Sequence, residues 1–387
     1  MSLWFSASAV VPQLTEAWGL SGGQQAWLTL SVQLGFVVGA LLSATTNIAD
    51  RVPAHKLFQV SALAGAACNA AIAVFDPGYA GVVGLRFLTG VCLAGIYPPA
   101  MKLMVSWYSH RRGLAIGILV AAATLGSALP HLFSAVPFFS GPAGLPPWRG
   151  VVATASWSAV LAAVLVAWGV RPGPDLPQSA PFDWRQATRT LTDPALRRAN
   201  MGYIGHMWEL YAMWAWAPIL LLESYRAAGL GEVFGRLAGF AVVAIGALGC
   251  VTGGALADRY GRTMVASTSL VASGLCALVV GWFGAMPIAL TAICLIWGFV
   301  VVADSAQFSA AVTELCEPSY VGTALTMQTA LGFLLTMATI RLVPWGLERF
   351  GWGVALGVLA IGPAVGVINM LRLRAMPDAA RLAGGLR

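Results

Sequence analysis

The chain has 387 residues, of which 58% are hydrophobic and only 10% are charged. A soluble domain carries about 25% charged residues, so this composition excludes a water-soluble globular protein. The net charge of +7 does not indicate nucleic-acid binding, because the basic residues are spread through short loops instead of being gathered on one domain. The six cysteines show no C-x-x-C spacing, and we therefore expect neither a disulfide framework nor a metal site.

Apolar stretches close to the ~20 residues that a membrane-crossing helix needs recur along the chain. They predict helices near residues 26–48, 57–75, 79–107, 113–136, 149–170, 199–222, 233–257, 263–284, 286–313, 320–344 and 352–371, preceded by a short apolar segment, Leu3–Leu14. With that segment counted, we expect an all-α polytopic membrane protein with twelve crossings. Fifteen of the 22 basic residues fall on one side and five on the other. The positive-inside rule then places both termini in the cytoplasm and the protein in the cytoplasmic (inner) membrane.

Two loops divide the chain into related halves. One reads T-N-I-A-D-R-V-P-A-H-K at 46–56 and the other G-A-L-A-D-R-Y-G-R-T-M at 254–264, which separates Asp50 from Asp258 by 208 residues. The same offset relates Gly90 to Gly298. We predict an N-terminal six-helix bundle at 1–170, a cytoplasmic linker at 171–198, a C-terminal six-helix bundle at 199–372 and a cytoplasmic tail at 373–387. Two such bundles can rock against each other and open a central site to alternate sides.

These loops resemble the G-x-x-x-D-R-x-G-R-[RK] signature of the major facilitator superfamily. The second copy fits at Gly254, Asp258, Arg259, Gly261 and Arg262. The first copy keeps Asp50 and Arg51 but has threonine, proline and alanine at 46, 53 and 54, where glycine, glycine and arginine are usual. The resemblance implies a rocker-switch transporter in which the motif is a latch between the half-bundles. A purely topological loop is the alternative.

Two further motifs in the first half bear on the resemblance. Arg86 and Gly90 resemble the family's R-x-x-x-G motif in helix 4. In helix 5, Gly117, Gly126 and Pro130 partly match the glycine and proline motif of the family's antiporters, which favours export slightly.

The first crossing is short in comparison with its repeat partner. Nineteen residues, Ala199 to Ala217, precede Pro218, but only eleven precede the corresponding Pro12. Leu3–Leu14 would span only ~18 Å as a helix, against a hydrocarbon core of about 30 Å. We therefore expect a truncated helix 1, with a true half-length helix that leaves a cytoplasm-facing cleft as the alternative.

Ionisable side chains inside the membrane are candidates for proton coupling, because burying a charge there is costly. His206 and Glu209 lie at i and i+3 on helix 7, where they can share a proton. Asp304, one turn before Gln307 on helix 10, is the next candidate. Arg86 can serve a substrate anion or proton coupling, or can instead hold backbone carbonyls between helices 4 and 5. A satisfied polar pair between helices is the alternative for His206 and Glu209.

Aromatic and amide side chains within the spans are candidates for the wall of a substrate cavity, namely Gln33, Tyr97, Tyr203, Tyr211, Trp214, Gln307 and Gln328. Each can equally be plain packing between helices. The sequence also has Lys102, interpreted as snorkelling toward the interface, and Glu314, interpreted as an interfacial charge.

The resulting expectation is a secondary transporter for a small amphipathic organic solute, anionic or cationic, with protons and the lipid bilayer as its other partners. No phosphate-cradling glycine loop and no nucleophile or metal-ligand constellation is present, so we expect no enzyme activity, nucleotide, nucleic acid or cofactor. We expect a monomer. Proton-coupled export is favoured over organic-anion uptake. The rival from another class is a transporter-like sensor that binds solute without moving it.

Overall fold

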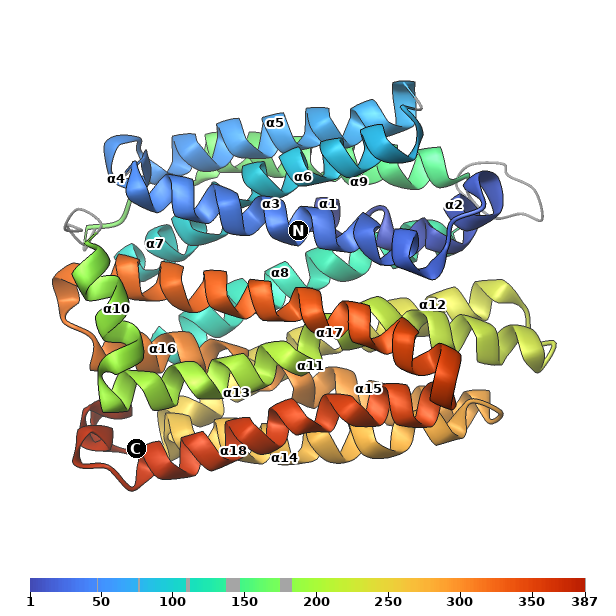
Figure 1. The fold of residues 1–387 in the computed structure, drawn as a ribbon. Coiled ribbons are helices and arrows are strands. Elements are labelled where there is room, and N and C mark those ends of the chain that lie inside the picture. Colours follow the sequence, from blue (N-terminus) through green and yellow to red (C-terminus); the bar gives the residue numbers. More distant parts are fainter. Residues whose placement is uncertain (47, 76, 109–111, 137–146, 175–182, 387) are drawn as a thin grey trace.

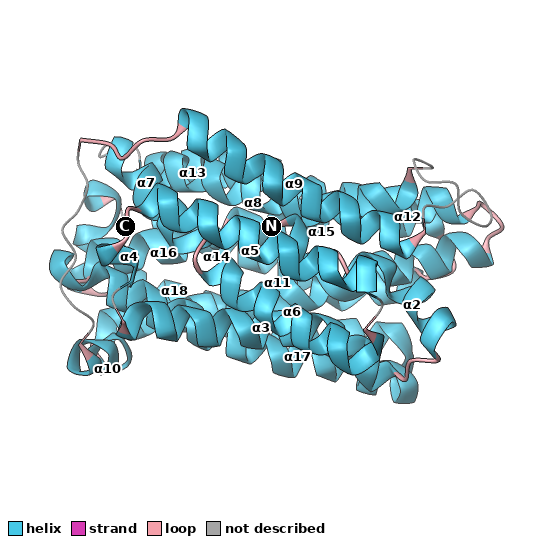
Figure 2. Cartoon of the chain, turned by 90° about the horizontal axis from the view of Figure 1, so that it is seen from above, coloured by secondary structure: helices cyan, strands magenta, loops and turns pink. Residues whose placement is uncertain are grey.

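A computed structural model describes residues 1–46, 48–75, 77–108, 112–136, 147–174 and 183–386, without the side chains of residues 49, 50, 105 and 112. Every regular element within these ranges is helical (Figure 1, Figure 2). Nine helical stretches of this described part are long and apolar enough to cross a membrane. In lipid the backbone has no water to bond to, so helices that satisfy their own N–H and C=O groups are the expected answer.

The first half begins with a broken segment and continues with longer helices. The segment consists of α1 (Ser2–Phe5), the 3-10 turn η1 (Ser8–Val10) and α2 (Val11–Trp18), and Met1 lies midway along the length of the bundle (Figure 1). The other helices are α3 (Gly22–Thr45), α4 (Ile48–Arg51), α5 (Ala54–Phe75), α6 (Gly78–Ala94), α7 (Tyr97–Trp107), α8 (Arg112–Ala135) and α9 (Trp148–Gly169). A capping box between Ser21 and Gln24 starts α3.

The second half contains α10 (Trp184–Thr192), α11 (Pro194–Ala227), α12 (Glu232–Ala244), α13 (Gly246–Tyr260), α14 (Arg262–Val280), α15 (Pro287–Ala303), α16 (Ser305–Leu315), α17 (Val321–Gly357) and α18 (Ile361–Arg374). Short 3-10 turns accompany them, η3 (Gly281–Phe283), η4 (Pro318–Tyr320), η5 (Val358–Ala360) and η6 (Pro377–Gly385). Gly351, with a φ of +77°, breaks α17, and the chain turns back there toward α18 (Figure 1).

Helix α11 is longer than the hydropathy pattern predicts. It starts at Pro194, because the Asp193 carboxylate accepts hydrogen bonds from the N–H groups of Ala195 and Leu196, both at 3.0 Å. An aspartate N-cap satisfies donors that a helix start otherwise leaves unpaired. Arg197 and Arg198 lie in the first turns, which is why an apolar window places the start later, at residue 199.

Glycines let paired helices approach closely at equivalent positions of the repeat. A Cβ atom on Gly90 of α6 would lie 2.0 Å from the carbonyl oxygen of Val32 in α3. A Cβ on Gly298 of α15 would lie 1.9 Å from the carbonyl oxygen of Val242 in α12. Both contacts exclude any side chain, as is usual where membrane helices pack backbone to backbone. The 208-residue offset read from the sequence therefore relates residues with the same packing role.

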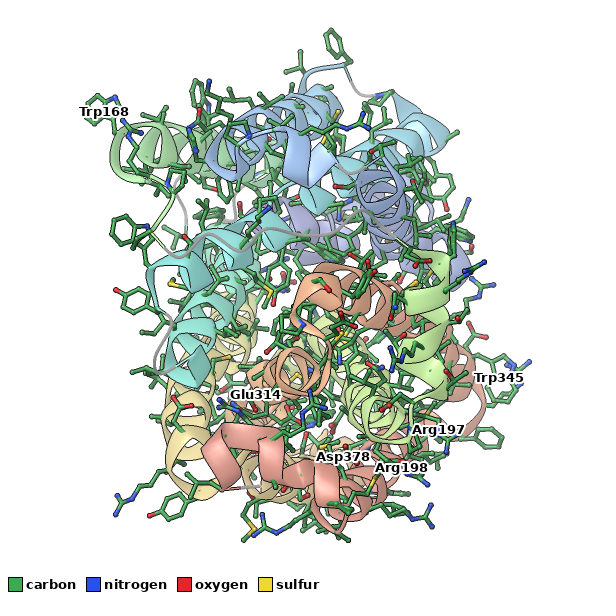
Figure 3. All side chains as sticks on the ribbon, turned by 90° about the vertical axis from the view of Figure 1, so that its left-hand side faces the viewer. Trp168, Arg197, Arg198, Glu314, Trp345 and Asp378 are labelled. Carbon is green, nitrogen blue, oxygen red and sulfur yellow. The ribbon has the colours of Figure 1, made fainter. Side chains whose placement is uncertain are left out.

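The two halves meet along two seams. At the α3–α17 seam, α3 of the first half packs on α17 of the second. At the α8–α13 seam, α8 of the first half packs on α12 and α13 of the second. The end of the bundle where α3 gives way to α4 and α13 to α14 is called the motif-loop end here, and it is on the left in Figure 1. Figure 3 views the molecule from that end, with Glu314 and Asp378 near the viewer and Trp168, 83% exposed, projecting from the side. Such exposed apolar side chains suit contact with lipid.

Candidate functional site

A cavity of about 430 Å³ lies between the two halves. Its wall includes residues of α3, α6, α7 and α8 from the first half and of α11, α15, α16, η4 and α17 from the second. Ser43 and Ala44, at the end of α3, and Pro318 and Ser319, in the turn before α17, line it as well. These four residues lie at the motif-loop end, so the cavity reaches that end of the bundle along the α3–α17 seam.

Aromatic rings close the other end of the cavity. The aromatic floor, defined as Trp4, Phe36, Tyr211, Trp214 and Phe333, links rings of both halves. Trp4 lies 5.6 Å from Tyr211 and 4.9 Å from Phe333, measured between ring centroids. Ring pairs at such distances stabilise each other beyond their buried area. The floor therefore fastens the two halves together on the side away from the motif loops.

The predicted cavity residues divide into two groups. Tyr97, Tyr203, Tyr211 and Trp214 line the cavity. The three glutamines do not appear in the described lining. Gln33 is fully buried in α3, Gln307 accepts a hydrogen bond from Arg262, and Gln328 accepts one from Ser309. Polarity alone does not tell which face of a helix is turned to the cavity, and here the aromatic residues were the better guide.

The proposed proton pair has different partners from those the sequence suggested. His206 Nδ1 lies 2.9 Å from Oδ1 of Asp304, and both side chains are 1% exposed. Among the described residues, Nε2 of His206 has no hydrogen-bond partner. The ring of Tyr203, which lines the cavity, lies 6.2 Å from the imidazole. Asp304 follows α15 directly, so the break between α15 and α16 brings its carboxylate to α11.

Glu209 is held by other groups of the same half. Its carboxylate accepts a hydrogen bond from Ser273 of α14 and one from Nε1 of Trp297 of α15, each at 2.7 Å. The side chain is 1% exposed. Thus His206 and Glu209 share a helix but not a hydrogen bond in this conformation, and the predicted pairing is replaced by two separate clusters inside the second bundle.

Arg86 contacts backbone and not the cavity. Its Nε donates to the carbonyl of Leu28 at 3.1 Å, and its two terminal nitrogens donate to the carbonyls of Leu3 and Trp4. Ser6 Oγ is a further acceptor, at 3.1 Å. The carbonyls belong to the broken first segment and to α3, whereas the sequence suggested the interface of helices 4 and 5. Arg86 supplies the donors that an interrupted helix inside a membrane needs.

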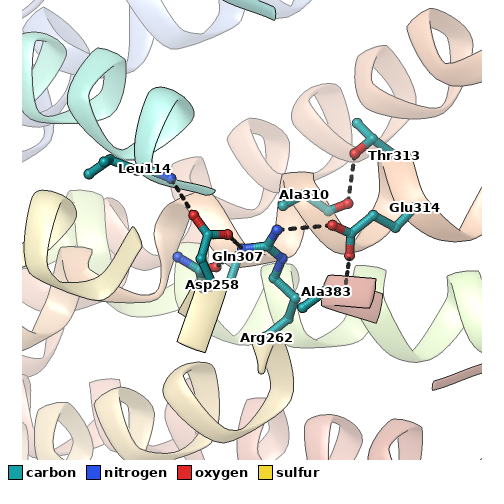
Figure 4. Close-up of polar contacts among 8 residues, drawn as sticks. All are labelled: Leu114, Asp258, Arg262, Gln307, Ala310, Thr313, Glu314 and Ala383. Atoms are coloured by element: carbon teal, nitrogen blue, oxygen red, sulfur yellow. Dashed lines mark hydrogen bonds and ion pairs between the residues drawn. The ribbon is translucent and has the colours of Figure 1, made fainter. Parts of the chain in front are cut away.

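The second motif copy bridges the two halves (Figure 4). Asp258 Oδ2 accepts a hydrogen bond from the backbone N–H of Leu114 in α8, at 3.1 Å. Arg262 donates to Asp258 at 2.8 Å and to Glu314 at 2.9 Å, and Glu314 in turn accepts from the N–H of Ala383 at 2.9 Å. The first turn of a helix offers unpaired N–H groups and a partial positive charge, so a carboxylate is stabilised there.

The two glycines of the second motif copy are each required by the local geometry. A Cβ on Gly254 would lie 2.6 Å from the carbonyl oxygen of Gly113, so only glycine allows α13 and α8 to approach this closely. Gly261 has a φ of +94°, a conformation that residues with a side chain rarely adopt, and it turns the chain from α13 into α14. Arg259, the remaining residue of the copy, is exposed and stacks on Tyr260.

The first copy lacks the two glycines and the second arginine of the motif, with Thr46, Pro53 and Ala54 in their places. Arg51 is exposed at the end of α4, and the side chain of Asp50 lies outside the described residues. Gly322, which corresponds to Gly113 in the repeat, lines the cavity, and a Cβ there would meet nothing within 4 Å. The second copy is therefore packed against its partner helix, while the corresponding place beside the first copy borders open cavity.

Sequence reasoning missed the partners that complete these clusters. Ser273 and Trp297 are ordinary span residues in the sequence, and nothing marks them as ligands of Glu209. Glu314 was interpreted as an interfacial charge, yet it pairs with Arg262. Its seven-residue spacing from Gln307, which also contacts Arg262, puts both on one face of α16 and was a usable signal.

The fold and the cavity define a polytopic membrane transport protein built from two six-helix bundles around a central site. The family model of the Major Facilitator Superfamily matches residues 1–334. The chain therefore belongs to the major facilitator superfamily, as its motifs predicted.

Two curated relatives match part of the chain at low identity. The chain is 29% identical over 147 residues to the "Niacin transporter NiaP" of Acinetobacter baylyi, covering 35% of this chain and 32% of that protein. It is 33% identical over 121 residues to the "Multidrug efflux pump LfrA" of Mycolicibacterium smegmatis, covering 31% and 23%. The alignments thus span about a third or less of these two relatives. The solved structure of the proton:xylose symporter XylE, bound to 6-bromo-6-deoxy-D-glucose, superposes with a TM-score of 0.73 at 14% identity, covering 96% of this chain and 93% of that one. That likeness concerns the fold.

Proposed function

We propose that this protein is a proton-coupled secondary transporter that moves a small organic solute across the cytoplasmic membrane by rocker-switch alternating access. In this proposal the motif-loop end and both termini face the cytoplasm, the bundles are residues 1–170 and 199–372, and the protein works as a monomer. The relatives include a niacin transporter and a multidrug efflux pump, which supports a small organic solute.

One observation supports alternating access above all. The cavity is walled by both halves, it reaches the motif-loop end, and rings of both halves block it at the other end. Opening toward the opposite side requires the aromatic floor to part and the α3–α17 seam to close. A rocking motion of one bundle against the other does both at once.

The clusters around His206 and Glu209 support proton coupling. The imidazole of His206 and the carboxylate of Asp304 can hold one proton as a pair without net charge, and release of that proton leaves the pair with one negative charge, so protonation changes the charge of the interior. Tyr203 lies between this pair and the cavity, so solute binding and protonation have a shared neighbour. Glu209, bound by two donors, is a second proton site. Arg86, with backbone acceptors, is a weaker candidate for this role.

The experiment first needs a solute, which thermal stabilisation of the purified protein across a chemical library identifies. In proteoliposomes, Glu209→Gln and Asp304→Asn should each abolish accumulation driven by a pH gradient while solute exchange at zero gradient persists. The neutral residues keep the shape of the side chain but do not ionise, so they cannot take up or release a proton during transport. Glu348→Gln, a change at an exposed carboxylate, is the matched control and should leave both activities intact.

Accumulation by Glu209→Gln with the wild-type pH dependence would move the proton site to Asp304 and His206. Accumulation by both variants would overturn proton coupling at these clusters. The direction of transport follows from the same vesicles, where we expect export, with organic-anion uptake as the alternative. A solute that binds but is never exchanged would favour the sensor interpretation.

A further inference from the structure

We propose that the central cavity selects small organic monoanions, carboxylates above all, that carry a flat apolar body, and that Lys102 and the indole N–H of Trp214 determine this selectivity. The inference rests on the proposed transport function and adds the substrate class of the same cavity. The sequence alone left an anionic and a cationic solute open.

Among the described residues, the side chains of the cavity wall carry charge of one sign. Of the lining residues that the structure describes, Lys102 on α7 is the one with a charged side chain. Four acidic residues adjoin lining residues in the sequence, and none of them belongs to the described lining. Asp304 pairs with His206, and Glu209 accepts bonds from α14 and α15 inside the second bundle. Glu314 pairs with Arg262, and Glu317 is exposed and accepts a hydrogen bond from Ser319 at the motif-loop end. A solute in the cavity therefore meets an ammonium group and no carboxylate of the described wall.

Lys102 lies where a carboxylate can reach it. It lines the cavity together with Met101 of the same helix and with Pro318 and Ser319 across the α3–α17 seam, near the motif-loop end. A lysine ammonium has three N–H donors, so it can bind a substrate oxygen alongside another acceptor. Between ions the attraction is stronger in a partly dehydrated cavity than in bulk water.

The deep part of the cavity fits a flat apolar body. Phe36, Tyr211, Trp214 and Phe333 of the aromatic floor line it, and Tyr97 faces it from the first half. Aromatic side chains bind planar rings by stacking and edge contacts. A volume of about 430 Å³ falls in the range of small-molecule sites, which is roughly 300–1,000 Å³.

Trp214 indicates that the solute carries a hydrogen-bond acceptor. The side chain is 4% exposed, and its Nε1 donor has no acceptor among the residues described. A buried N–H without an acceptor is unfavourable, so a solute oxygen that reaches it is favoured. The neighbouring ring of Tyr211, with its centroid 5.4 Å away, borders the same place.

Other solute classes fit less well. Aromatic rings can also attract a cation, but the ammonium of Lys102 opposes a second positive charge in the same cavity. A sugar needs side chains that pair with several hydroxyls, and the described lining contains no asparagine, glutamine, aspartate or glutamate. The described lining has nine serine and threonine hydroxyls and three tyrosine hydroxyls, and none of these offers the paired donor and acceptor of an amide or the two acceptor oxygens of a carboxylate.

Three probes with one ring system and different charge test the inference, namely 1-naphthoate, 1-naphthamide and 1-naphthylmethylamine. Binding to the purified protein is measured by calorimetry and by quenching of tryptophan fluorescence. We expect 1-naphthoate to bind tightest. Lys102→Met should weaken 1-naphthoate about tenfold or more, as expected for loss of a charge-assisted contact, and should change 1-naphthamide far less. Lys56→Met alters the chain's other lysine, which is exposed at the start of α5, and should change neither affinity.

Trp214→Phe keeps an aromatic ring and removes the donor. It should weaken 1-naphthoate and 1-naphthamide alike, because both probes carry an acceptor oxygen, and Trp345→Phe at an exposed site should not. The readout is a ratio of affinities within each variant, which partial loss of folded protein does not change. For Lys102→Met it is the ratio of carboxylate to amide, and for Trp214→Phe it is the ratio of each of these to the amine, which has no acceptor oxygen. Tighter binding of the amine than of the carboxylate, or a ratio that Lys102→Met leaves unchanged, overturns the anion selectivity.

Exchange of labelled probe in proteoliposomes separates this inference from the proposed function. If the amine or the amide is exchanged and the carboxylate is not, transport stands and the anion selectivity is wrong. If the carboxylate binds in a Lys102-dependent manner and no probe is exchanged, the anion site stands and transport is wrong. Binding of none of the probes overturns the selectivity as well, since 1-naphthoate has every feature the cavity is proposed to select.

Discussion

The two halves of the repeat differ in the contacts that their motif copies can make. In the second half, Asp258 binds the start of α8, and Arg262 joins it to Glu314 on α16. The 208-residue offset places Ala54 opposite Arg262 and Ser106 opposite Glu314, so the first half lacks both members of that ion pair. The α8–α13 seam is therefore fastened at the motif-loop end, while the cavity leaves the bundle beside the α3–α17 seam.

This difference indicates which of the two seams opens and closes. A latch that is intact in one copy and degenerate in the other lets one seam act as a hinge and the other open and close. We infer that α8 and α13 stay together near the motif loops while α3 and α17 separate. Variants at matched positions of the repeat can break or sharpen this comparison, and four follow in order of expected effect.

The largest effect is expected at Arg86, whose repeat partner is Cys294. Arg86→Met removes the guanidinium donors of three buried carbonyls, those of Leu3, Trp4 and Leu28, and an acceptor left unsatisfied costs about 1–3 kcal/mol. Leu3 keeps the Ser6 hydroxyl as a donor. We expect a large loss of thermal stability in detergent, measured as the unfolding midpoint. Cys294→Ala, also fully buried, should cost only about 1 kcal/mol. An Arg86→Met protein with wild-type stability and no proton-driven accumulation would assign Arg86 to coupling instead.

The second effect concerns the glycine that brings α13 against α8. Gly254→Ala places a methyl group where it would lie 2.6 Å from a backbone carbonyl oxygen, so the helices must separate at a cost of about 1–3 kcal/mol. Thr46→Ala, the matched change in the exposed first copy, should stay within about 0.5 kcal/mol. Unfolding midpoints of the two variants measure the difference. Equal midpoints would mean that the α8–α13 contact is not tighter than its counterpart.

Removal of the latch carboxylate comes third. Asp258→Ala loses the bonds to Leu114 and Arg262, which are formed in this structure while the cavity reaches the motif-loop end. We therefore expect the conformational equilibrium to shift about 5- to 150-fold away from the state open at that end. Cysteines introduced at Ser319, beside the cavity mouth, and at Thr29, buried toward the opposite end, report the shift by thiol labelling in a cysteine-free background.

Labelling at 319 should fall and labelling at 29 should rise. Arg51→Ala in the first copy serves as the control and should alter neither rate, since that side chain is exposed. Unchanged labelling in Asp258→Ala, together with no flux of a bound ligand, would favour the sensor interpretation.

The smallest effect is expected from rebuilding the first copy. The triple variant Thr46→Gly, Pro53→Gly and Ala54→Arg restores the usual residues of the motif. We expect labelling at the Ser319→Cys position to fall less than about tenfold, because Ser106 offers no carboxylate to the new arginine. A rise in labelling would show that the first copy does not act as a latch on the α3–α17 seam.

Several features of the fold were predictable because they depend on local sequence. Long apolar runs specify membrane helices, and the 208-residue offset between the motif copies related Gly90 to Gly298 before their contacts were known. Bounds were less predictable, since the helix through Glu209 begins at Pro194 by capping and not by hydropathy. Among the site residues, Tyr97, Tyr203, Tyr211 and Trp214 were predicted in the cavity and line it.

The pairing of charges was not predictable from spacing. His206 and Glu209 share a face of α11, yet the partners of one come from the α15–α16 junction and those of the other from α14 and α15. Similarly, the basic character of Arg86 indicated an ionisable site, and the carbonyls that satisfy it lie 58 to 83 residues away in the sequence.

By itself, the sequence determined the helical membrane class, the tandem repeat and the family, because hydropathy, periodicity and motif spacing are properties of neighbouring residues and of a fixed offset. Only the tertiary structure decided which buried charges pair, which side chains face the cavity and which seam is fastened. Those outcomes depend on how helices distant in the chain rotate and approach, and a rotation of one helix by a single residue position exchanges a cavity-facing side chain for a buried one.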